Sequence, residues 1–132
     1  MPAHSSTYRT NLLFVYGTLR RGARNPFADQ LHRVSTFVGD AQLPGRLYRV
    51  SWYPAAVYDP AADTFITGEV FRLHDPAALL PDLDAYEDVP SGLYVRRALA
   101  VMGLGQPTTA WVYLYNQPIT NLVRIESGEW QG

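Results

Sequence analysis

Hydrophobic residues recur along the chain in short runs with strand-like spacing, separated by segments rich in proline, glycine and aspartate. The run at residues 12–16 is rich in branched and aromatic side chains, which is typical of a buried strand. Strict alternation predicts another strand at residues 65–73. Further strands are predicted at residues 37–38, 47–50, 52–58, 93–102, 108–115 and 122–125. Pro44 and Gly45 predict a turn or bulge between two of them, and Pro54 favours an edge position.

Two helix starts share a polar N-cap followed by proline, at Asn25-Pro26 and at Asp75-Pro76. They predict one helix over residues 27–34 and another from residue 76 to residue 86 or 87. Pro81 interrupts the second helix, which either kinks there or gives way to a turn before a new helix begins. Many short strands with two or three helices predict an α+β fold.

The composition predicts one folded domain. The chain has 132 residues, of which 47% are hydrophobic and 17% are charged, so it can bury a core. We expect residues 12–132 to form this domain and the polar residues 1–11 to form a flexible N-terminal segment. A signal-like or membrane-spanning apolar run is missing from the sequence, so we expect a cytoplasmic protein that does not bind membranes.

Several kinds of chemistry are disfavoured by residues that the sequence lacks. It contains no cysteine and no lysine, which excludes thiol catalysis, disulfides and a Schiff-base lysine. The three histidines are scattered without ligand spacing, so we expect no metal. Gly17 and Gly22 have the spacing of a phosphate-binding loop, but Ala23 and Arg24 replace its essential residues, so we expect no nucleotide cofactor.

Nucleic-acid binding is not expected either. The net charge of −1 gives no general attraction for a polyanion. The cluster Arg20, Arg21 and Arg24 is typical of a solvated surface. Alternation places Trp111, Tyr113 and Tyr115 on one strand face, which is more typical of a core or pocket wall than of a base-stacking platform.

The first candidate site is the turn that follows the strand at residues 12–16. Gly17 lacks a Cβ, which permits positive φ and lets backbone amides approach a ligand closely. Thr18 and Leu19 extend this turn, and exposed amides of this kind bind an anion or a developing oxyanion. From the residues alone, an ordinary loop after a buried strand remains an equally good interpretation.

The second candidate is Glu87. On a helix it shares a face with Leu80 and Leu83, which directs its carboxylate to the apolar side. It also lies at the C-terminal end of the helix, where the macrodipole disfavours an anion. Burial, with the like charge of Asp84 nearby, would raise its pKa toward values suited to proton transfer. Alternatively, the helix ends before Glu87 and the side chain extends into water.

Two motifs make the chain resemble a known family. The segment Tyr16-Gly17-Thr18-Leu19-Arg20 and the segment Leu83-Asp84-Ala85-Tyr86-Glu87, followed by Tyr94, resemble the signature loop and acidic motif of γ-glutamylcyclotransferase-like proteins. These include the γ-glutamylamine cyclotransferases and the AIG2-like proteins. Further matching segments occur in the family's order, at residues 45–48, 53–55, 68–71, 110–113 and 127–130. The resemblance covers nearly the whole chain and implies a small mixed β-barrel with a few short helices.

The resemblance also implies an activity and its residues. Members cyclise a γ-glutamyl group to 5-oxoproline and release the amine. Glu87 would be the catalytic acid and base, and Tyr94 would line the glutamyl site. The loop of Tyr16, Gly17, Thr18 and Leu19 would bind the glutamyl group. A departure is Asp88, where many members carry glycine; we expect this difference to affect the shape of the loop and the choice of substrate.

Three questions stay open at this point. The chain is either a cyclotransferase or a non-catalytic binding or regulatory member of the same fold. Its partner is expected to be a small γ-glutamyl compound. The family's range extends over γ-glutamyl amino acids, γ-glutamyl-ε-lysine and acylated carrier proteins. The oligomeric state cannot be read from the sequence.

Overall fold

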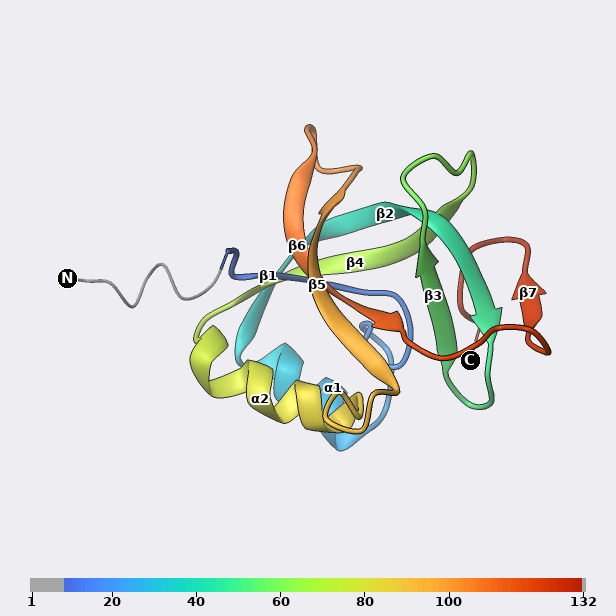
Figure 1. Ribbon diagram of the computed structural model, residues 1–132. Helices are drawn as coiled ribbons and strands as arrows, with labels where there is room; N and C mark the ends of the chain where they lie inside the picture. Colours follow the sequence, from blue (N-terminus) through green and yellow to red (C-terminus); the bar gives the residue numbers. More distant parts are fainter. Residues whose placement is uncertain (1–8, 132) are drawn as a thin grey trace.

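The fold is a curled β-sheet with two helices packed on one side (Figure 1). The computed structural model describes residues 9–131. The first eight residues of the predicted N-terminal segment lie outside this range. In chain order the elements are β1 (Leu12–Val15), α1 (Pro26–Arg33), β2 (Ser35–Arg49), β3 (Pro54–Tyr58), β4 (Phe65–Leu73), α2 (Pro76–Tyr86), β5 (Tyr94–Val101), β6 (Thr108–Tyr115) and β7 (Val123–Ile125).

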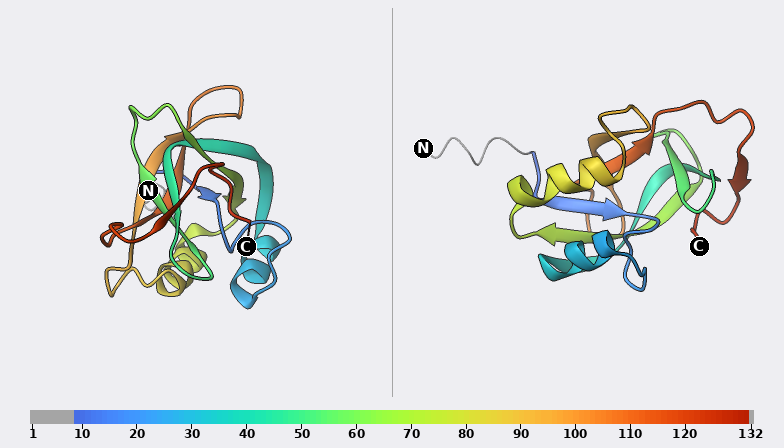
Figure 2. Two further views of the ribbon diagram at one scale, coloured as in Figure 1. Left: turned by 90° about the vertical axis from the view of Figure 1, so that its right-hand side faces the viewer. Right: turned by 90° about the horizontal axis from the view of Figure 1, so that it is seen from below.

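The strand order explains why the sheet curls. The strands follow one another as β3-β2-β4-β1-β6-β5, and β7 pairs with β2. β1 and β6 run parallel, whereas the other pairs are antiparallel. Gln42 in β2 exchanges two backbone hydrogen bonds of 2.8 Å with Met102, just after β5. This bridge brings strands from distant positions in the sheet order together, so the sheet forms the small barrel-like curl seen in Figure 2.

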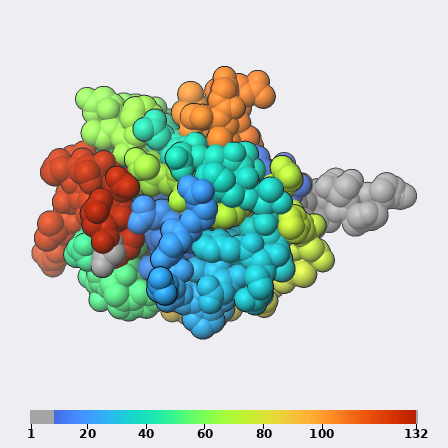
Figure 3. All heavy atoms as spheres, turned by 180° about the vertical axis from the view of Figure 1, so that it is seen from behind, coloured from blue at the N-terminus to red at the C-terminus, as the bar shows by residue number. Residues whose placement is uncertain are grey.

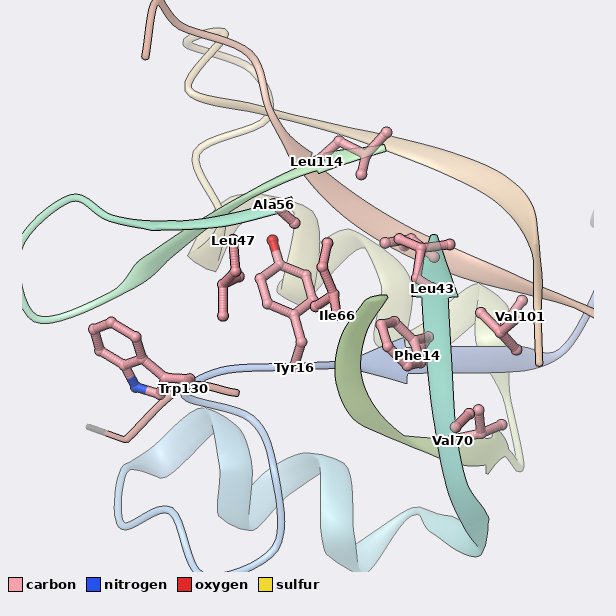
Figure 4. Packing of buried hydrophobic residues seen from close by; sticks show 13 residues of the cluster. Phe14, Tyr16, Leu43, Leu47, Ala56, Ile66, Val70, Val101, Leu114 and Trp130 are labelled. Carbon is pink, nitrogen blue, oxygen red and sulfur yellow. The ribbon is translucent and has the colours of Figure 1, made fainter. Parts of the chain in front are cut away.

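Alternation along the strands divides the core into two clusters. In β1, Leu13 and Val15 face the helices, whereas Phe14 faces the inside of the curl, as does Tyr16 just after the strand. Figure 4 shows the inner cluster, in which Tyr16 lies near Ile66 and points its hydroxyl toward Ala56. Because the two clusters meet along β1, the end of this strand is held from both sides.

The predicted turn or bulge at Pro44 and Gly45 is wrong. β2 runs through both residues without interruption, and its register shift lies earlier, between Phe37 and Gly39. Gly45 instead adopts a φ of 149°, and a Cβ there would lie 2.1 Å from the carbonyl oxygen of Val57. The glycine therefore permits close approach of β3, not a change of chain direction.

Pro81 does not break the second helix, which settles the alternative left open by the sequence. α2 is continuous through Pro81, with Asp75 as its N-cap. Its buried side chains Leu79, Leu80 and Leu83 belong to the cluster between helices and sheet. Their burial offsets the backbone hydrogen bond that the proline cannot make.

Candidate active site

A cavity lies where β1 ends, and all six residues singled out from the sequence line it. The six are Tyr16, Gly17, Thr18, Leu19, Glu87 and Tyr94. The wall of the cavity also includes residues that the sequence did not assign to the site, among them Tyr53, Pro54 and Tyr113. The six predicted residues come from the end of β1, the end of α2 and the start of β5. The fold therefore brings the two predicted motifs into one site.

Gly17 serves this site in a different way from the one predicted. Its φ is not positive; the turn's left-handed glycine is Gly22, at φ 88°. A Cβ on Gly17 would lie 2.8 Å from Cγ and 2.9 Å from Cδ of Pro54. The residue has to be glycine because the Pro54 ring packs against its backbone, which also brings the start of β3 to the cavity.

The carbonyl oxygens of residues 17–19 all have hydrogen-bond partners. Arg20 donates from its backbone to the Gly17 oxygen (3.2 Å), Asn25 from its side-chain amide to the Thr18 oxygen (2.8 Å), and His32 Nε2 lies 2.9 Å from the Leu19 oxygen. Within residues 9–131, the amides of residues 17–19 have no hydrogen-bond acceptor. The loop is thus rigidly held and keeps three unused donors.

The C-terminal segment holds this loop from behind. The side chain of Arg20 donates to the carbonyl oxygens of both Gly17 and Trp130. Trp130 is buried in the inner cluster, and Figure 3 shows the red C-terminal residues against the blue segment that follows β1. Residues at both ends of the domain therefore fix the position of the loop.

Glu87 owes its position to the way in which α2 ends. The amide of Val89 donates to the Asp84 oxygen (3.0 Å), and that of Asp88 donates to the Ala85 oxygen (3.1 Å). With Asp88 at a φ of 55°, this pattern is a Schellman motif, and Glu87 is its C-cap. The helix does end before Glu87, as the alternative interpretation had it, but the side chain lines the cavity.

The carboxyl of Glu87 is strongly perturbed. Burial, with a smaller contribution from the charge of Asp84, raises its pKa from 4.5 to about 8. The Glu87 carboxyl forms no hydrogen bond with another residue in the range 9–131. Arg96 donates to the Asp84 carboxylate at 2.8 and 3.1 Å. Glu87 can therefore exchange a proton near neutral pH.

The hydroxyls of Tyr16 and Tyr94 are engaged with backbone carbonyls. Tyr94 donates to the carbonyl oxygen of Pro54, and Tyr16 donates to that of Tyr113. Burial raises the pKa of both phenols, and the charge of Glu87 contributes in the same direction. Both rings are consequently neutral, fixed walls of the cavity.

A second, wider depression continues outward from the cavity and is called the outer compartment here. The two share Thr18, Tyr53, Glu87 and Tyr94. The outer compartment adds Trp52, Tyr86, Asp88 and Leu93 to its lining. Trp52 and Tyr86 were not assigned to a site from the sequence, because only the packing of the β2–β3 turn against the end of α2 brings them together.

Groups of three or more histidine, aspartate or glutamate side chains placed to hold a metal ion are absent from residues 9–131. None of the helices in this range has the length and apolarity needed to cross a membrane.

Comparison with known proteins agrees with the architecture and the motifs. The model of the family "Gamma-glutamyl cyclotransferase, AIG2-like" matches residues 13–132. The γ-glutamylcyclotransferase family protein YtfP of Escherichia coli K12 is 34% identical over 125 residues, covering 89% of this chain and 94% of YtfP. The mouse γ-glutamylaminecyclotransferase is 34% identical over 98 residues, covering 70% of this chain and 64% of the mouse protein.

Similarity extends to solved structures. The crystal structure of a mouse AIG2-like protein superposes with a TM-score of 0.73 at 28% identity, covering 91% of this chain and 88% of that one. The superposition thus includes the curled sheet and both helices. The family model and the YtfP relative each span most of the chain. The chain therefore belongs to the γ-glutamylcyclotransferase, AIG2-like family.

Proposed function

We propose that this protein is a cyclotransferase that converts a γ-glutamyl amide into 5-oxoproline and a free amine. The observation that carries the proposal is the shared cavity of Glu87 and the three unused loop amides. The names of the bacterial and mouse relatives favour the same reaction class. A site for intramolecular attack needs no nucleophile of its own, which agrees with a chain that has neither cysteine nor lysine.

The substrate supplies both reacting groups. Its α-amino nitrogen attacks its own γ-carbonyl carbon, and the five-membered lactam closes as the amide C–N bond breaks. A cavity that holds the glutamyl chain in a curled conformation lowers the barrier through proximity, an effect of at most about 7–11 kcal/mol. The neutral walls formed by Tyr16 and Tyr94 suit the methylene groups of this chain.

Glu87 carries protons between the two nitrogens. The α-ammonium group loses two protons as it becomes the lactam N–H, and the departing nitrogen gains two and leaves as an ammonium group. Glu87 accepts each proton as a carboxylate and delivers it to the departing nitrogen as an acid. A pKa of about 8 matches this double role, since neither protonation state is strongly favoured near neutral pH. We therefore expect kcat/KM to rise with pH up to about 8, as the free enzyme becomes ionised at Glu87.

The loop amides of residues 17–19 stabilise the negative charge on the γ-carbonyl oxygen or hold the α-carboxylate of the substrate. Donors fixed in advance are effective because they need no reorganisation during the reaction. Arg20, Asn25 and His32 provide that rigidity by occupying the carbonyls of the same loop.

The direct test follows 5-oxoproline release from γ-glutamyl amides. Glu87→Gln is expected to lower kcat by at least about a hundredfold, the usual contribution of a general acid and base. Glu126→Gln, a change of the same kind at a side chain that is 81% exposed, serves as the matched control. Full activity in a folded Glu87→Gln protein would disprove its role. Substrate binding without turnover by wild type would favour the non-catalytic alternative.

A further inference from the structure

Tyr113 contacts both parts of the cavity, although it belongs to neither of the two motifs. It lies in β6, which is placed between β1 and β5 in the sheet. Its side chain is buried and forms part of the cavity wall, together with Glu87 and residues 17–19 of the loop. A residue of an inner strand is therefore in a position to fix the loop and the end of α2 relative to each other.

The backbone of Tyr113 holds the beginning of the loop. Its carbonyl oxygen accepts a hydrogen bond from the Tyr16 hydroxyl. The parallel pairing of β1 with β6 reaches Phe14 and Val112, so this bond continues the connection beyond the end of β1. Since Tyr16 directly precedes Gly17, the loop with its unused amides begins at a point that is fixed on β6.

The hydroxyl of Tyr113 holds the end of α2. It donates to Oδ1 of Asp84 at 2.7 Å. The backbone oxygen of Asp84 accepts the amide of Val89, which is one of the bonds that form the Schellman motif around Glu87. Burial raises the pKa of Tyr113, and the bond to Asp84 acts in the same direction, so the phenol stays protonated and remains a donor.

A second contact keeps Asp84 in place. The guanidinium of Arg96, which donates twice to the Asp84 carboxylate, lies over the ring of Trp111 at 4.4 Å from its centroid. Removal of the Tyr113 hydroxyl should therefore leave α2 folded and displace its last turn only slightly. Even a slight displacement matters, because a misplacement of about 1 Å can lower the rate of a reaction by about a hundredfold.

We propose that Tyr113 is a positioning residue that sets the separation between the Glu87 carboxyl and the loop amides. It acts through Asp84 on one side and through Tyr16 on the other, and it exchanges no proton with the substrate. The inference rests on the proposed function and adds a residue to it. Glu87 must reach both nitrogens of a substrate that the loop holds, so the relative placement of the two affects the transition state more than substrate binding.

The first test is Tyr113→Phe, which removes the hydroxyl and retains the ring and the backbone carbonyl. We expect kcat for 5-oxoproline release to fall about tenfold, as for the loss of a hydrogen bond to a charged group, and KM to change by less than about twofold. The matched control is Tyr58→Phe in β3, where the hydroxyl makes no hydrogen bond within residues 9–131. This control should have the kcat of wild type.

A double-mutant cycle tests whether the hydroxyl acts through Asp84. Asp84→Ala removes the acceptor, so adding Tyr113→Phe in that background should lower kcat by less than about twofold. Each kcat is measured at a temperature at which circular dichroism shows the variant to be folded. If Tyr113→Phe lowered kcat by the same factor with and without Asp84, the hydroxyl would not act through this carboxylate and the proposal would be overturned.

The outcomes separate this inference from the reaction on which it rests. If wild type releases 5-oxoproline and Tyr113→Phe keeps the full kcat, or changes only KM, the reaction stands and the positioning role is wrong. If wild type releases no 5-oxoproline from γ-glutamyl amides, the proposed function fails and the inference falls with it.

Discussion

Glu87→Gln should make the folded protein more stable at neutral and alkaline pH, although it removes the proposed catalytic group. Burial raises the pKa of Glu87 to about 8 in the folded protein, whereas the unfolded chain titrates near 4.5. Between these values the folded state binds the proton and the unfolded state releases it. The stability contribution of the protonated carboxyl is therefore complete below pH 4.5, decreases as the pH rises, and is lost above about pH 8.

The size of this effect follows from the two pKa values. Their separation corresponds to a ceiling of about 5 kcal/mol above pH 8, and to about 3 kcal/mol at pH 7. Glu87 is only partly buried, so solvent screens its carboxylate and reduces the cost of ionisation. We therefore expect Glu87→Gln, which stays neutral at every pH, to exceed wild type by about 2 kcal/mol at pH 8.

Urea unfolding at half-unit steps from pH 4 to pH 9 measures this difference. Wild type and Glu87→Gln should have nearly the same free energy of unfolding at the acid end and should diverge as the pH rises. Glu126→Gln, at an exposed position, should run parallel to wild type. If the difference in free energy of unfolding between wild type and Glu87→Gln were the same at every pH, the pKa of Glu87 would be the same in the folded and the unfolded chain. That result would refute the argument from burial.

Three further changes test the surroundings of the site. Asp84→Asn removes a like charge that helps to raise the pKa of Glu87, so the rise of kcat/KM with pH should move to lower pH; an unmoved profile would contradict this. Asp88→Gly should raise the free energy of unfolding by about 1 kcal/mol in chemical denaturation, because φ is 55° there; a loss of stability would count against it. Gly17→Ala should cost about 1–3 kcal/mol of stability through its clash with Pro54, and adding Pro54→Ala should recover most of this loss; no recovery would place the strain elsewhere.

Local patterns predicted the elements whose signals lie within their own residues. β4 matches the predicted strand at residues 65–73, and β6 matches residues 108–115, because both strands alternate strictly between the two clusters. The caps at Asn25 and Asp75 likewise predicted where α1 and α2 begin. These signals are read from neighbours in the sequence, so tertiary structure did not override them.

Features that depend on tertiary contacts were missed or wrongly predicted. The length of β2 depends on pairing with β3 and β4, which keeps Gly45 extended where its local sequence predicts a turn. The need for glycine at position 17 comes from the ring of Pro54, far away in sequence. That the two motifs share one cavity followed from the family resemblance. Trp52, which lines the outer compartment, lies in neither motif and was therefore missed.

Asp88 fixes the geometry of the chain at the end of α2. Its left-handed conformation completes the Schellman motif that ends α2 and leaves Glu87 at the C-cap. Glycine would meet this backbone requirement with less strain, yet the chain places an unpaired carboxylate there, at the C-terminal end of a helix. Asp88→Gly should therefore stabilise the fold and keep Glu87 at the C-cap, so 5-oxoproline release should persist in the same protein. A stabilised variant that lost this activity would mean that the Asp88 carboxylate itself takes part in the reaction.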